Sequence, residues 1–178
     1  MRRPIAALAL SALALVTPSL AQLPAHGQQE PQKVLESTTS GLNLASVQAK
    51  VVQGDAAASA GKLNEAKADY DQALEAASYL VTAYRGLSGA FRGLDARIPR
   101  EMDQKGREAT ELQANIELRL AALLRRMNQP QVAVPLLVRV VQRMSPTSPQ
   151  GQKAYQSLIE LGFVTTPYTA VTPVPAGQ

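Results

Sequence analysis

The chain has 178 residues, of which 46% are hydrophobic and 18% charged, and it contains no cysteine and one histidine. This length suits one domain that can bury a core without covalent cross-links. The lack of cysteine excludes disulfides, thiol nucleophiles and cysteine-ligated metals, and a lone His26 excludes any site that needs several histidines.

The N-terminus has the pattern of a secretory signal peptide. Two arginines precede an apolar run of about 12 residues, Ile5–Val16, and the small residues Ser19 and Ala21 occupy the −3 and −1 positions of a cleavage site. An uncleaved anchor is the alternative, but roughly 20 apolar residues are needed to cross a bilayer and Pro18 interrupts this run. We therefore expect residues 1–21 to be removed on export to the periplasm, the cell exterior or, in a cyanobacterial host, the thylakoid lumen.

Two polar segments flank the central part of the chain. Residues 22–40 are rich in Gln, Pro and Ser/Thr, and residues 165–178 contain three prolines that prevent a continuous helix or central strand. We expect both tails to be disordered, with His26 a surface side chain of the first tail. Without the signal peptide, the 18 basic and 14 acidic residues become 16 and 14, so overall charge gives no reason to expect nucleic acid binding.

The body between the tails, residues 41–164, is predicted to be all-α. It is rich in Ala, Leu, Gln, Glu and Arg, and strict alternation over the length of a strand is absent. Apolar residues recur at steps of three and four in the stretches 66–77, 109–127 and 132–144. No later stretch is long and apolar enough to be a transmembrane segment.

Proline, serine and glycine mark the predicted helix ends. Ser148 followed by Pro149 opens a helix that runs to Leu161, and Gly162 closes it. Pro99 and Pro130 open helices that run to Met127 and Met144. Pro135 lies one turn inside the second of these, which predicts a kink or a later helix start.

The stretch from Gly61 to Leu74 resembles the second half of a tetratricopeptide repeat. The matching residues are Gly61, Leu63, Ala66, Tyr70, Ala73 and Leu74, preceded by Gly54 where the family has a small residue between its two helices. A second unit begins at Val81, consistent with a repeat of about 34 residues, and Tyr84, Leu87 and Phe91 mimic the family's aromatic signature. The resemblance implies an α-solenoid of about three helix–turn–helix units, the third starting near Ala114, with helix 149–161 as a cap.

The resemblance also has departures. Lys50 and Gln53 stand where the first unit should have its aromatic and Leu, and residues 97–112 match poorly. That stretch can instead continue into the next helix as one long helix from Pro99 to Met127. An irregular helical bundle rich in Ala and Leu is the alternative to a repeat array.

Charge is segregated along the body. Residues 119–159 contain six basic and no acidic residues, whereas residues 54–75 contain five acidic and two basic ones. If the family alignment holds, Asn115, Arg119 and Arg126 project into the inner groove of the solenoid and Arg125 lies nearby. We expect these four residues to bind a protein partner, for which an acidic segment is the candidate, because guanidinium groups pair with carboxylates. A solvated basic face is the alternative, and the family's carboxylate clamp is not reproduced, since Val51 and Asp55 occupy its first positions.

These observations predict an exported binding module without enzymatic activity. The acidic residues look solvated, and the sequence has no phosphate-binding loop, nucleophile elbow or EF-hand, so no cofactor or metal is expected. We expect an accessory, assembly or scaffold factor. The alternatives are a structural subunit of an exported or membrane-associated complex, or a binder of polyanions or anionic surfaces. The sequence indicates neither the partner's identity nor the oligomeric state.

Overall fold

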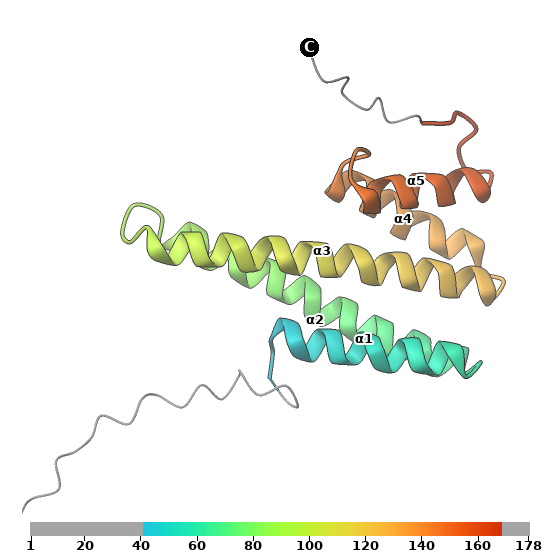
Figure 1. The fold of residues 1–178 in the computed structure, drawn as a ribbon, viewed down its shortest axis with the longest axis horizontal. Helices are drawn as coiled ribbons and strands as arrows, with labels where there is room; N and C mark the ends of the chain where they lie inside the picture. Colours follow the sequence, from blue (N-terminus) through green and yellow to red (C-terminus); the bar gives the residue numbers. More distant parts are fainter. Residues whose placement is uncertain (1–40, 169–178) are drawn as a thin grey trace, which may run out of the picture. The chain divides into compact units, whose positions relative to one another are not determined.

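The computed structural model describes residues 41–168, and in this range the regular secondary structure consists of five α-helices (Figure 1). These are α1 (Leu44–Ser59), α2 (Leu63–Ala90), α3 (Arg97–Arg126), α4 (Pro130–Met144) and α5 (Pro149–Glu160). The prediction of an all-α body is confirmed. The predicted signal peptide, the first tail with His26, and residues 169–178 of the second tail lie outside the described residues. Among the residues described, none of the helices combines the length and the apolar character needed to cross a membrane.

Each helix packs against the next along the chain, and two further contacts define one face. α1 and α5 both contact α3, whereas the described parts of α2 and α4 do not contact each other. In Figure 1, α2 runs behind α1 and α3, and α4 lies behind α5. Helices α1, α3 and α5 therefore share one face, and α3 is the central helix of the fold.

The core follows the apolar stripes that the sequence predicts. Buried residues of α3 include Ile116, Leu120 and Leu123, which recur at steps of three and four, and Leu137 and Val140 of α4 pack in the same cluster. Burying each such side chain contributes roughly 1.5–3 kcal/mol. Because most of these residues are on α3, this helix determines where its neighbours lie.

The helix ends confirm most of the boundary predictions. The Ser148 hydroxyl accepts a hydrogen bond from the backbone N–H of Gly151 at 3.0 Å, and Pro149 is the first residue of α5. Gly162 has a φ of 73°, the left-handed conformation that ends a helix. α4 begins at Pro130 and continues through Pro135, so the predicted later start is wrong. The helix tolerates Pro135 near its N-terminus, where only one backbone hydrogen bond is lost.

The predicted unit boundaries are not helix ends. Val81, the expected start of the second unit, lies inside α2, because residues 75–83 contain neither glycine nor proline and nothing interrupts the helix. The alternative of one long helix from Pro99 to Met127 is confirmed within two residues by α3. Helices α2 and α3 are thus about twice as long as a repeat helix, which spans little more than a dozen residues.

Residues predicted to pack between repeat helices divide into three groups. Gly54, Ala66, Tyr70 and Ala73 are buried, and the Tyr70 ring lies so close to Gly54 that a methyl group there would come within 2.6 Å of Cε1. Leu63, Leu74 and Tyr84 are partly buried against the core, and Gly61, with a φ of 77°, lies in the turn before α2. Phe91 is half-buried at the end of α2. Leu87 is 46% exposed, so about half of its side chain is not covered by the residues that the structure describes.

The start of the predicted C-terminal tail contacts α5. The Tyr155 hydroxyl donates a hydrogen bond to the carbonyl oxygen of Thr166 at 2.8 Å, and the rings of Tyr155 and Tyr168 meet edge-on with centroids 6.1 Å apart. Residues 165–168 therefore lie against α5.

Candidate partner-binding groove

An open groove of about 610 Å³ lies on the face shared by α1, α3 and α5. Polar and charged side chains from all three helices line it, and the buried residues Leu118 and Leu137 contribute apolar surface. The lining residues are Asp55, Asn115, Leu118, Arg119, Ala121, Ala122, Arg125, Leu137, Lys153, Gln156, Ser157 and Glu160. Three of the four predicted partner-binding residues, namely Asn115, Arg119 and Arg125, are thus brought together, whereas Arg126 does not line the groove.

Arg119 connects α3 to α1 at one end of the groove. Its Nε donates to both carboxylate oxygens of Asp55, at 3.1 and 3.2 Å, and its Nη1 donates to the carbonyl oxygen of Asn115 at 3.4 Å. Asp55 also accepts a hydrogen bond of 2.5 Å from the Tyr70 hydroxyl on α2. One carboxylate therefore links three helices.

The environment of Tyr70 favours its neutral form. Burial, the hydrogen bond to Asp55 and the negative charge of that carboxylate together raise the pKa of the phenol above its ordinary value of 10.0, while Arg119 and Arg126 oppose this shift. Tyr70 is therefore a neutral hydrogen-bond donor at physiological pH.

The other two predicted arginines make contacts within the protein. Arg125 pairs with Glu160 of α5, with Nη1 and Oε2 2.9 Å apart, and both side chains are exposed. Arg126 donates from Nη2 to the carbonyl oxygen of Ala58 at 3.1 Å, in the last turn of α1. This carbonyl also accepts a hydrogen bond from the backbone N–H of Gly61 at 3.2 Å, and a guanidinium at the C-terminal end of a helix interacts favourably with the helix dipole. Arg126 thus stabilises α1 on α3.

Glu117 is a buried acid that the sequence reasoning missed. Its side chain is 1% exposed and accepts hydrogen bonds from Arg139 Nε at 3.0 Å and from Arg143 Nη1 at 2.5 Å. Both arginines lie on α4, so this carboxylate joins α4 to α3. One signal was available, since Glu117 lies between Ile116 and Leu118 in an apolar stripe, where a lone carboxylate needs a cationic partner.

The basic C-terminal half is partly neutralised in the fold, because three carboxylates pair with its basic side chains. Four of its six basic side chains form ion pairs. Their partners, Asp55, Glu117 and Glu160, all lie outside residues 119–159. Lys153, which lines the groove, has no carboxylate within ion-pair distance in the range 41–168. The groove itself carries three basic and two acidic side chains, so it is polar and only slightly positive.

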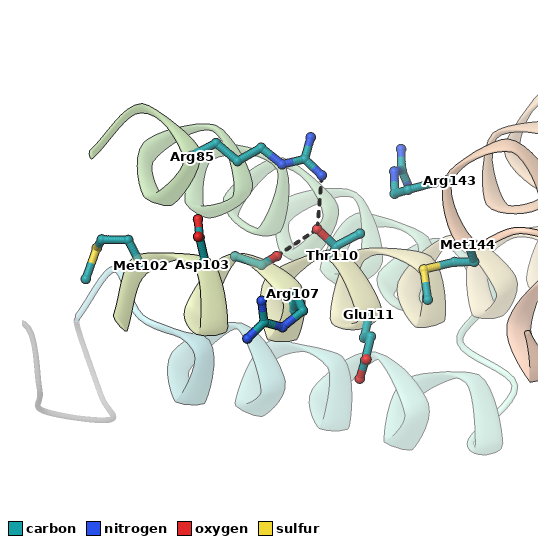
Figure 2. A pocket seen from close by; sticks show the side chains of 9 residues that line it. Arg85, Met102, Asp103, Arg107, Thr110, Glu111, Arg143 and Met144 are labelled. Carbon is teal, nitrogen blue, oxygen red and sulfur yellow. Dashed lines mark hydrogen bonds between the residues drawn. The ribbon is translucent and has the colours of Figure 1, made fainter. Parts of the chain in front are cut away.

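A second cavity, of about 350 Å³, lies where α2 and the end of α4 flank α3 (Figure 2). The guanidinium of Arg85 points to the Thr110 hydroxyl, 3.5 Å away, and Arg143 lies beyond it. The buried Ser88 hydroxyl donates to Asp103 at 2.6 Å. These contacts hold α2 on α3, and the Arg143 guanidinium is already bound to Glu117.

Neither cavity brings together a set of metal ligands. Among the described residues, no three His, Cys, Asp or Glu side chains are grouped so that they could hold a metal ion. What the groove offers is a row of hydrogen-bond donors and acceptors beside a strip of small and apolar residues, an arrangement that suits a polypeptide segment. No known protein family, curated protein or solved structure matches the chain.

Proposed function

We propose that this protein is an exported, non-catalytic binding module that holds a segment of a partner protein in the groove formed by α1, α3 and α5. The observation that carries the proposal is the groove itself, which is open, about 610 Å³ in volume, and lined by residues of α1, α3, α4 and α5. Binding sites of this kind place a few polar groups around an apolar floor, which gives both affinity and orientation.

The proposal includes a short helical array similar to tetratricopeptide proteins. Two features support it: the contacts that α1 and α5 make with α3, and the close approach of Gly54 to Tyr70 at the predicted contact between two repeat helices. In such arrays alternate helices line the inner surface, and that surface binds partners. The fused helices α2 and α3 make this an irregular member of that architecture.

The chemistry of the groove points to a partner segment with both carboxylate and neutral polar groups. Arg119 and Arg125 are already paired with Asp55 and Glu160, so a strongly acidic segment would have to displace these acids. Lys153 and Gln156 are exposed and free to contact a ligand. A partner therefore binds by hydrogen bonds and one or two ion pairs, with weak to moderate dependence on salt.

A blocking substitution in the groove tests the proposal without disturbing the interhelical ion pairs. Ala122 is exposed on α3 and lines the groove, so Ala122→Arg fills the groove but leaves Arg119 and Arg126 in place. The matched control is Ala68→Arg on α2, an equally exposed alanine that is not among the lining residues.

The measurement is chemical cross-linking of the exported protein followed by purification, with circular dichroism to confirm the helical content of each variant. We expect the wild type and Ala68→Arg to recover the same partner and Ala122→Arg to lose it. Recovery of that partner at an unchanged level by a folded Ala122→Arg would exclude the groove as the binding site.

A further inference from the structure

The hairpin tip, residues 86–100, joins α2 to α3 and extends past the ends of the helices beside it. The first residues of α1 lie next to Glu108 and Leu112 of α3, and the last residue of α4 lies next to Gly106 and Thr110. Neither helix reaches the tip, which projects as a two-helix end (Figure 1). Among the described helices only α2 and α3 are present there, and each covers just one side of the other.

Apolar side chains are exposed at this tip. Leu94 is 78% exposed, the highest value among the large hydrophobic residues of the described chain, and Leu87 is 46% exposed. Phe91 lies half-buried between them at the end of α2. Gly93, with a φ of 86°, makes the turn that presents Leu94 at the apex.

Three exposed arginines accompany these apolar residues in the same stretch of chain. The tip contains Arg92, Arg97 and Arg100 and a single acid, Asp95, which pairs with Arg97 at 2.7 Å. In the part of the chain that the structure describes, no carboxylate pairs with Arg92 or Arg100. The tip therefore has an excess of two positive charges around an exposed apolar apex.

We propose that the hairpin tip docks on an anionic lipid surface, with Leu94 and Leu87 in the interface and Arg92 and Arg100 on lipid phosphates. Apolar side chains ringed by basic residues bind membrane surfaces because the apolar area and the attraction to anionic lipids add. A lipid surface is favoured over a protein partner because the exposed leucines and the unpaired arginines lie in one short stretch at the end of a hairpin. This docking does not depend on the groove, because no residue of the tip is among the residues that line the groove.

The absence of cysteine from the chain makes a local probe possible. A fluorophore sensitive to polarity is attached to the single cysteine of Leu94→Cys in the full chain. The matched control is Val132→Cys, a residue that is 46% exposed at the start of α4, away from the tip. Vesicles of phosphatidylglycerol with phosphatidylcholine, and vesicles of phosphatidylcholine alone, are then added to each protein.

We expect a blue shift at position 94 with the anionic vesicles only, and none at position 132. In co-sedimentation, replacing Arg92 or Arg100 by Ala lowers the partition coefficient about five-fold each. Leu94→Ser lowers it about ten-fold, and Val132→Ser leaves it unchanged. Because all variants share the same N-terminus, binding by the apolar segment of residues 5–16 affects all of them equally.

Three results would overturn the proposal. The first is no shift at position 94 with anionic vesicles, or an equal shift at position 132. The second is a shift that depends on protein concentration without vesicles, which would indicate self-association through the tip. The third is a shift that requires another protein and does not occur with lipid, which would assign the tip to a protein partner.

Discussion

Replacing Gly54 by alanine tests the contact on which the packing of α1 against α2 depends. A Cβ at this position would lie 2.6 Å from Cε1 and 2.7 Å from Cδ1 of Tyr70. The ring cannot move freely, because it is 3% exposed and its hydroxyl is bound to Asp55. Either the two helices separate or the ring moves and breaks that hydrogen bond.

The expected loss of stability follows from three contributions. Overpacking of a well-packed core costs about 1–3 kcal/mol. Loss of a hydrogen bond to a charged group costs about 1.5–3 kcal/mol. Against these, alanine is favoured over glycine in a helix by about 1 kcal/mol. The helices or the ring can relax in part, so we expect Gly54→Ala to lower the unfolding free energy by about 2 kcal/mol.

Gly86→Ala is the matched control, because it makes the same substitution in another helix. Nothing lies within 4 Å of a Cβ at Gly86, so only the helical preference for alanine remains and stability should rise by about 0.5–1 kcal/mol. Urea unfolding followed by circular dichroism measures both changes, and the midpoint for Gly54→Ala should fall by about 1 M. A midpoint for Gly54→Ala at or above the wild-type value would refute the close packing of Gly54 on Tyr70.

Two further predictions concern buried polar groups. Glu117→Gln should lower the unfolding free energy by about 2 kcal/mol, less than for a fully buried pair because the Arg139 side chain is 46% exposed and can reach water. Glu160→Gln removes an exposed pair and should lower the unfolding free energy by less than about 1 kcal/mol. If urea unfolding gives the same loss for Glu117→Gln and Glu160→Gln, the burial of Glu117 is contradicted. The Tyr70 phenol keeps its proton to higher pH in the folded state than in the unfolded state. Its contribution to the unfolding free energy is therefore fully present below pH 10.0 and falls as the pH rises above that value. Unfolding measured against pH should show that this fall is smaller in Tyr70→Phe, and an identical slope in both proteins would contradict the raised pKa.

Local sequence was sufficient for the helices and most of their ends. The steps of three and four around Ile116 and Leu137 predict faces that are buried, and Ser148, Pro149 and Gly162 mark the limits of α5. Such signals succeed because capping and periodicity act within one or two turns of the chain. The family resemblance placed Gly54 at a contact between two helices, whereas its contact with the Tyr70 ring comes from the structure.

The extent of α2 was harder to predict. A repeat pattern placed a boundary at Val81, yet nothing in the neighbouring residues ends a helix. The 46% exposure of Leu87 is likewise something that the repeat pattern did not predict. Patterns of small and apolar residues specify which face is buried, but they do not specify where one helix stops and the next begins.

By itself, then, the sequence determined the all-helical body, its apolar faces and the chemistry that the chain lacks. Only the tertiary structure decided the charge of the groove, because Arg119 meets Asp55, 64 residues away, and Arg125 meets Glu160, 35 residues away. The physical reason is that helix formation depends on neighbours along the chain, whereas an ion pair depends on a separation of a few ångströms in space. A count of charges along the sequence therefore predicts a basic half. In the folded chain, several of those basic side chains form ion pairs between helices instead.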